Sequence, residues 1–165
     1  MSKKFINNII IEGGRIIFRN FAGEESKFNR AGNRNFCAII SNDMVDQLKE
    51  DGWNIKELPP REEEDEPTYY LQVTVSYKVA PPKIMLVTNK YKTKLSEDTV
   101  ASIDYADIEN VDMVIHPYLW EVNGKSGVKA YLESMYVKIR EDYFASKYSD
   151  LNTNEDIPTF PSDPF

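Results

Sequence analysis

The chain has 165 residues, of which 41% are hydrophobic, and its formal net charge is −7. This length suits one domain with a core of its own, and the hydrophobic content excludes a wholly disordered chain. The single cysteine excludes an internal disulfide framework, the single histidine leaves almost no material for a His-rich metal site or a Ser-His relay, and no run of 18 apolar residues is present to span a membrane. The first residues make a poor secretion signal, so we expect a reducing, intracellular setting.

Two β-rich runs open the chain, at residues 8–12 and 15–21. Gly13 and Gly14 lie between them, and a two-residue glycine turn between such runs is typical of a β-hairpin. We therefore expect the first two strands to pair with each other.

A polar, basic stretch at 23–32 predicts a loop, and the alternation of apolar residues that follows predicts a third strand over 34–40. The segment 41–52 begins with two residues that favour helix N-caps, contains a short apolar stripe and ends on a glycine. It predicts a helix of about two turns.

The second half of the chain is dominated by strand patterns. Two long strands, 111–122 and 128–139, are joined by Asn123–Gly127, whose Asn-Gly pair predicts a hairpin because both residues tolerate positive φ. A helical turn is expected from residue 96. Shorter strands are expected at 53–58, 69–79, 84–88 and 90–94. Seven or eight strands with one or two short helices predict a mainly β fold, either a small antiparallel barrel or a strongly curved sheet.

The negative charge is concentrated in two segments. Residues 62–66 are five consecutive acids, and 149–165 contains four acids and no base. The rest of the chain holds the other 18 acidic residues and all 20 basic residues. Half of those basic residues lie in 15–34 and 78–94. Such basic stretches are candidates to follow a phosphate backbone. A solvated sheet face carrying lysines is the alternative interpretation, and charge alone does not separate the two.

Aromatic residues are interleaved with the lysines and arginines of the chain. Single-stranded nucleic acid exposes bases that stack on aromatic rings and phosphates that pair with cations, so this pattern predicts a binding groove. About half of the aromatic residues suit a core equally well, Phe36 and Trp53 above all. The predicted phosphate partners are Arg15, Arg19, Lys27, Arg30, Arg34, Lys90, Lys92, Lys94 and Lys125. The predicted stacking residues are Phe18, Phe28, Tyr91, Trp120 and Tyr131.

Catalysis has little support in the sequence. His116 lies inside a predicted strand and favours a structural role, and Cys37 lies in an alternating strand and favours the core. Asp104, Asp107 and Asp112 could on paper hold the two cations of a nuclease, but a water-facing turn and loop explain them more simply. We therefore predict no enzyme activity, no cofactor and no metal.

The C-terminal segment has a distinctive ending. Residues 149–165 lack apolar periodicity, which predicts a flexible acidic tail behind a domain at 1–148. A terminal Phe with a free carboxylate, preceded by acids and prolines, can anchor in an apolar pocket with a basic rim. The candidate partner-binding residues are Asp156, Ile157, Pro158, Phe160, Asp163, Pro164 and Phe165. The ending resembles the acidic tip of bacterial single-stranded DNA-binding proteins, although Thr159 interrupts the pattern and the acids are fewer.

The body of the chain carries a second resemblance, through residues 18–21, 28–29, 32–36, 51–54 and 118–131. These segments resemble phage-encoded single-stranded DNA-binding proteins of the OB-fold type. The resemblance implies an OB-like antiparallel β-barrel that binds and protects single-stranded DNA without sequence preference during phage replication or recombination. It also implies that the tail recruits replication or recombination proteins in the cytoplasm of a bacterial host cell.

Another class of function stays open. The net charge and the acidic run 62–66 equally suit a phage protein-interaction module, such as an inhibitor or adaptor of a host enzyme or a DNA mimic. The oligomeric state is also open, with a homo-oligomer as one option, and so is the choice between DNA and RNA.

Overall fold

The computed structural model describes residues 6–60, 62–63, 66–78 and 80–140. Within these residues the chain is mainly β, as predicted, with one short α-helix and two 3-10 turns. The strands are β1 (Ile9–Gly14), β2 (Ile16–Asn20), β3 (Arg34–Ile40), β4 (Ile55–Leu58), β5 (Thr68–Val75), β6 (Lys83–Val87), β7 (Lys92–Leu95), β8 (Ile108–Val122) and β9 (Lys125–Ile139). The helical elements are η1 (Asn42–Met44), α1 (Val45–Asp51) and η2 (Val100–Tyr105).

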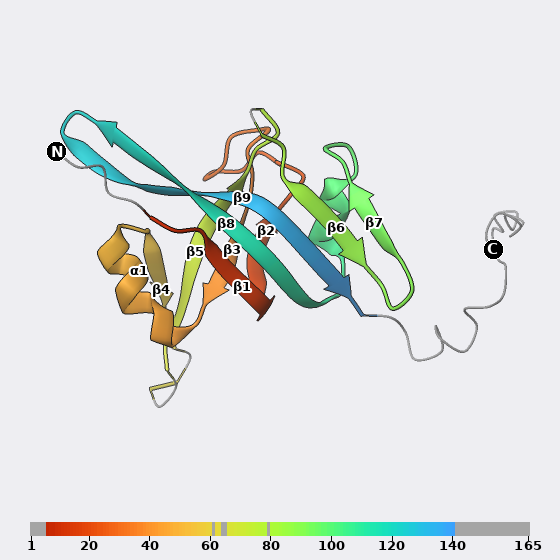
Figure 1. Ribbon diagram of the computed structural model, residues 1–165, viewed down its shortest axis with the longest axis horizontal. Coiled ribbons are helices and arrows are strands. Elements are labelled where there is room, and N and C mark those ends of the chain that lie inside the picture. Colours follow the sequence, from red (N-terminus) through yellow and green to blue (C-terminus); the bar gives the residue numbers. More distant parts are fainter. Residues whose placement is uncertain (1–5, 61, 64–65, 79, 141–165) are drawn as a thin grey trace, which may run out of the picture.

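The strands form one curved, open sheet around the core (Figure 1). Its main path runs β1-β8-β9-β5-β3-β2. β4 pairs with β5 on the edge away from β3, and β6 pairs with both β9 and β7. The arrangement agrees with the predicted OB-like fold. Two pairings, β5 with β9 and β6 with β9, are parallel within an otherwise antiparallel sheet.

The hairpin predicted at Gly13-Gly14 is wrong. β1 pairs with β8, with Ile10 opposite Val114, whereas β2 pairs with β3. Gly13 has a φ of 63° and donates its N–H to Asp112 over 2.7 Å, and a Cβ at Gly14 would lie 2.4 Å from the Ile11 side chain. The glycines therefore form a bulge at the end of β1, where Gly14 still pairs with Val111 of β8. The chain reaches β3 at Arg15, whose carbonyl accepts the Ile39 N–H.

Other local predictions are confirmed. The third strand spans the predicted residues, and α1 ends at Gly52, whose φ of 105° lets its N–H bond to the carbonyls of Leu48 and Lys49. The expected side-chain N-cap is not made, because the chain enters α1 through η1 and neither element has a capping side chain.

The longest elements form the predicted hairpin, but its turn is tighter than the sequence suggested. Asn123 and Gly124 alone make the turn, with φ of 52° and 80°, and Val122 pairs directly with Lys125. Figure 1 shows the end of this hairpin projecting beyond the rest of the sheet. We call this projecting end the arm, residues 117–130.

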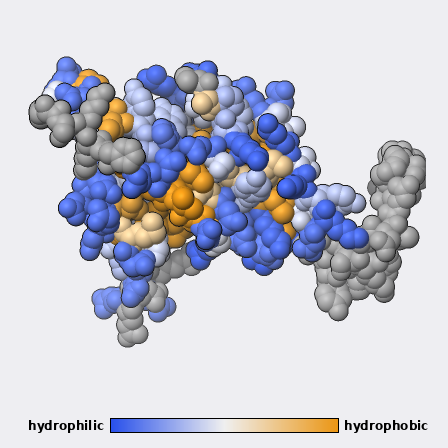
Figure 2. Space-filling view, in the orientation of Figure 1, coloured by the Kyte–Doolittle hydropathy of each residue, from blue (hydrophilic) through white to orange (hydrophobic). Residues whose placement is uncertain are grey.

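The core lies on the inner side of the sheet. Phe21 and Phe36 are fully buried and stack with ring centroids 5.1 Å apart, and Trp53 is 3% exposed, so the core roles expected of Phe36 and Trp53 are confirmed. The outer surface is mostly hydrophilic apart from an apolar area over β1 and β8, where Ile10 is 65% exposed (Figure 2). In the described part of the chain, no helix is long and apolar enough to cross a membrane.

Candidate nucleic-acid interface

The β8–β9 pairing places aromatic residues on the outer side of the arm. Tyr118 is opposite Lys129 and Trp120 is opposite Gly127, and directly opposite residues share one face. The intervening residues of β9, Val128 and Ala130, are buried, which fixes the aromatic side as the exposed one. We call Tyr118, Trp120, Lys129 and Tyr131, with Gln72 and Thr74 of β5 beside them, the aromatic face.

The rings of the aromatic face hold one another in place. Tyr118 and Tyr131 meet edge to face with centroids 6.0 Å apart, and the Lys129 ammonium lies 5.2 Å from the Tyr131 centroid. The Trp120 indole rests on Gly127, where an added Cβ would come within 2.8 Å of the ring. Tyr118 and Trp120 nevertheless remain 56% and 38% exposed. The face therefore offers positioned aromatic rings and a cation to a flat, anionic ligand.

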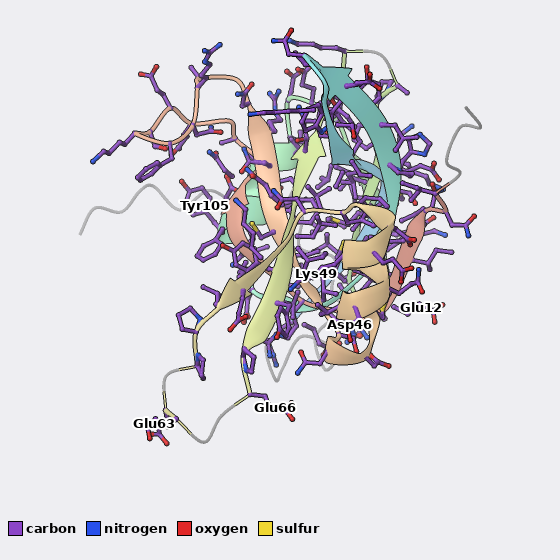
Figure 3. The ribbon with its side chains drawn as sticks, turned by 90° about the vertical axis from the view of Figure 1, so that its left-hand side faces the viewer. Glu12, Asp46, Lys49, Glu63, Glu66 and Tyr105 are labelled. Atoms are coloured by element: carbon purple, nitrogen blue, oxygen red, sulfur yellow. The ribbon has the colours of Figure 1, made fainter. Side chains whose placement is uncertain are left out.

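A groove of about 430 Å³ runs beside the aromatic face. It opens where β9 separates from β4 and β5, since β5 meets β9 only at Thr74 and Tyr131. Figure 3 views the molecule from the side of α1, with β4 and β5 in front and the arm above them. The lining residues are Gly52, Trp53, Asn54, Leu71, Gln72, Thr74, Trp120, Ser126, Gly127, Val128, Lys129 and Ala130.

The outer side of the sheet continues from the groove toward β2. Tyr70 of β5 is two residues from Gln72, so the two side chains share a face, and Lys56 is its neighbour on β4. Phe18 lies at the irregularity in β2 with a φ of 51°, is 59% exposed, and meets Tyr70 edge to face at 5.8 Å. The structure thus joins the predicted Phe18 to the aromatic face through Tyr70.

A lysine-rich surface lies at the other end of β9. Lys92 and Lys94 of β7 are opposite Val87 and Met85 of β6, on the side of the sheet that carries Tyr136. The Lys83 ammonium lies 5.4 Å from the Tyr136 centroid. A hydrogen bond from Lys83 and the charges of Lys83 and Lys92 lower the pKa of the Tyr136 phenol. Positive charge from Lys83 and Lys92 therefore acts on this ring.

Two predicted phosphate partners are engaged within the fold. Arg19 donates Nη1 to the carbonyls of Ile103 and Ala106, at 2.7 and 2.8 Å, and so fixes η2 against β2. Arg34 forms an ion pair with Glu97 at 3.2 Å. The structure does not bring these two arginines to the aromatic face.

The other predicted basic residues lie in separate places on the surface. Lys27, Phe28 and Arg30 belong to the loop between β2 and β3, where Phe28 is 91% exposed and the Lys27 ammonium lies 5.7 Å from its ring centroid. Arg15 lines a second hollow, of about 590 Å³, between β1 and β3. Lys90 and the 71% exposed Tyr91 occupy the β6–β7 turn, and Lys125 begins β9. Their role in binding stays a prediction.

The predicted partner-binding residues of the tail, Asp156 to Phe165, lie outside the described residues. The boundary predicted between residues 148 and 149 lies outside them too.

Sequence reasoning missed Tyr70, Gln72, Tyr118, Lys129 and Tyr136. A pattern that points to Lys129 was present, because the residues two apart from Lys125 to Tyr131 are Lys, Gly, Lys and Tyr. Alternation with period two places such residues on one side of a strand, which the observed register bears out. Tyr70 and Gln72 had no comparable pattern, because only their partners in other strands bring them to the face.

The three aspartates considered for a nuclease site form hydrogen bonds and an ion pair within the fold. Asp104 accepts hydrogen bonds from the backbone N–H groups of Phe21 and Ala22 at 2.7 and 3.0 Å. Asp112 accepts the Gly13 N–H, and Asp107 forms an ion pair with Arg140 at 3.4 Å. Residues 6–140, apart from the few not described, hold no group of three or more side chains placed to bind a metal ion.

Cys37 is buried on β3, and burial raises the pKa of its thiol from 9.0 to about 11, against a smaller opposing effect of the Lys56 charge. We expect the folded protein to react slowly with thiol reagents near neutral pH, because the thiolate is the reactive form. Because the folded state holds the thiol proton more tightly than the unfolded state, Cys37 contributes stability that is fully present below about pH 9. This contribution is lost as the pH rises through about 11. Alkylation rates with and without denaturant test this. Equal rates in the two conditions would contradict it.

Comparison with known proteins gives a consistent result. A family model described as "Putative phage ssDNA-binding domain" matches residues 1–162. Three solved structures of the single-stranded DNA-binding protein from bacteriophage Enc34 share the fold at 13% identity. A C-terminal truncation has a TM-score of 0.55 over 82% of this chain and 87% of that one, and a complex with ssDNA has 0.53 over 82% and 88%. The third structure has 0.51 over 90% and 89%. No curated protein sequence matches this chain.

Proposed function

Because this chain belongs to the family of phage ssDNA-binding domains, we propose that it binds single-stranded DNA without strong sequence preference and protects it. The observation that carries the proposal is the aromatic face, which holds exposed rings beside Lys129 and along a groove. A protein of the same fold, from bacteriophage Enc34, has been solved in complex with ssDNA, which supports the same ligand here.

Binding of this kind requires no bond to form or break. Stacking of successive bases on Tyr118, Trp120 and Tyr131 provides affinity that any base can supply, since every base has a π face. Lys129 and the lysine-rich surface of β6 and β7 pair with phosphates and release counterions. Lys27, Phe28 and Arg30 of the β2–β3 loop are proposed to contact the DNA strand as well. The protein thus acts as a binding protein and not as an enzyme.

We further propose that the protein serves phage DNA replication or recombination in the host cytoplasm, with its tail recruiting the enzymes involved. The acid, Ile-Pro and terminal Pro-Phe pattern of residues 156–165 supports this role. Deletion of residues 149–165 is the direct test. It should abolish co-purification of a replication or recombination enzyme while leaving the DNA-binding domain able to bind oligo-dT.

The ligand is tested by fluorescence anisotropy with labelled oligo-dT, oligo-dA and a duplex of equal length. We expect both single strands to bind with similar affinity and the duplex to bind more weakly, because paired bases cannot reach the rings. Absence of binding to either single strand at low salt would overturn the proposed function.

Salt dependence separates phosphate contacts from stacking. The slope of log K against log salt is about −0.7 per phosphate neutralised on a single strand. We expect Lys129→Ala and Lys92→Ala each to reduce the size of that slope by about 0.7. Lys49→Ala is the matched control, because Lys49 lies on α1 with its ammonium 5.5 Å from the Tyr69 centroid, on the opposite side of β5 from Gln72. An equal loss of slope in the control would contradict the assignment.

A further inference from the structure

Both tryptophans of the chain line the groove beside the aromatic face. They reach it from distant parts of the sequence, since Trp53 follows α1 and Trp120 lies on the arm. Trp53 is brought there by the parallel bridge that joins it to Val128. The two indoles differ in exposure, because Trp120 is 38% exposed and Trp53 only 3%. One indole therefore offers its face to a ligand, and the other is part of the wall.

The buried indole carries an unused donor. The Nε1–H of Trp53 is buried and has no hydrogen-bond partner among the described residues. An N–H group removed from water without an acceptor is unfavourable, and native proteins rarely leave one. An indole N–H can only donate, so it needs an acceptor, and none of the described residues supplies one. Asn54 and Gln72 place further polar groups on the same wall.

The remaining surfaces of the groove suit a flat apolar ring. Leu71, Val128 and Ala130 contribute buried apolar side chains, and Trp120 is supported from behind by Gly127. Lys129 lies at the same site and belongs to the aromatic face. A nucleotide combines what these groups require, namely a π face, an acceptor atom on the ring edge and a phosphate.

We propose that the groove is a nucleotide subsite in which one base of the bound strand stacks on Trp120 while an acceptor atom on its edge receives the Trp53 Nε1–H. This inference rests on the proposed function and goes further, because it places one base inside a defined pocket with the others on the open face. The Trp53 donor acts at this one position of the strand.

Indole N–H resonances give a direct readout, since ¹⁵N-labelled protein should show two such peaks, assigned with Trp53→Phe and Trp120→Phe. The probes are an oligo-dT of about 12 nucleotides, within the site size of one OB fold, and an abasic oligomer of equal length and charge. Oligo-dT should shift both peaks, with the Trp53 proton moving downfield as it gains an acceptor. The abasic oligomer should leave the Trp53 peak in place.

Two variants separate the parts of the subsite. Trp53→Phe keeps an aromatic ring in the wall and removes the donor, so oligo-dT affinity should fall about threefold to tenfold. Gly127→Ala adds a methyl that would lie 2.8 Å from the Trp120 ring, so the indole must move and affinity should fall about tenfold. Tyr105→Ala is the control, because this 82% exposed tyrosine lies on η2, beyond β2 from the arm (Figure 3). Circular dichroism establishes that each variant folds.

The outcomes distinguish this inference from the proposed function. If the unmodified protein binds no single strand, the proposed function fails. If it binds oligo-dT while the Trp53 peak stays still, or if the abasic oligomer shifts that peak equally, the subsite is overturned and the binding function stands. A Trp53 shift caused by a peptide of residues 149–165 and not by oligo-dT would also overturn it, and would make the groove a peptide site.

Discussion

Replacing Trp120 with alanine is expected to weaken binding to oligo-dT by about 10- to 100-fold. One base stacked on an aromatic side chain contributes about 1–3 kcal/mol, and Trp120 presents the largest ring of the aromatic face. The indole is also held in place by Gly127 on the opposite strand, so the bound strand loses little free energy in ordering it. Anisotropy titration of labelled oligo-dT at fixed salt measures the change.

Tyr105→Ala is the matched control for this experiment, because it removes an exposed aromatic ring that lies away from the arm. Its affinity should equal that of the unmodified chain. The slope of log K against log salt should also stay unchanged in Trp120→Ala, because the variant removes a ring and no charge. Equal losses in the two variants would show that exposed aromatic area in general, and not the aromatic face, provides the affinity.

The largest effect on stability is expected from Phe36→Ala, which should lower the free energy of unfolding by about 3–5 kcal/mol. Phe36 is fully buried and stacked on Phe21, so its removal leaves a cavity between β3 and the segment that follows β2. Urea denaturation followed by circular dichroism measures the change in midpoint.

Phe28→Ala is the corresponding control, since this phenylalanine is 91% exposed. Its unfolding free energy should change by about 0.5 kcal/mol or less. The same variant tests whether Phe28 stacks on DNA, in which case oligo-dT affinity falls while stability does not. A Phe36→Ala protein of unchanged stability would contradict the core assignment.

The charge of −7 acquires a different meaning when it is located in the fold. Lys83, Lys92 and Lys129 lie on the outer side of β6, β7 and β9, while Asp104 and Asp112 are held by backbone N–H groups. Several acids thus stabilise turns and neighbouring segments, and lysines line the side that carries the rings. Net charge alone would have argued against a nucleic-acid ligand, whereas the local charge agrees with one.

Features set by local backbone chemistry could be predicted from the sequence. The helix ends at Gly52 because glycine readily adopts the left-handed conformation, and Asn123-Gly124 makes the hairpin turn for the same reason. The alternation in β3 placed Phe36 on the buried side. Each of these patterns acts within a few residues, so no distant partner had to be known.

Long-range pairing decided the rest. The turn predicted at Gly13-Gly14 is instead a bulge at the end of β1, because the register with β8 and β3 depends on strands that are far away in the sequence. Arg19 and Arg34 carry the same positive charge as Lys129. Only the tertiary structure shows that the carbonyls of Ile103 and Ala106 engage Arg19 and that Glu97 engages Arg34. The sequence by itself determined the strand content and named Trp120 and Tyr131. Only the pairing of β9 with β8 and β5 placed those rings beside Lys129 and opened the groove that holds Trp53, since a shared face is a property of register and not of one strand.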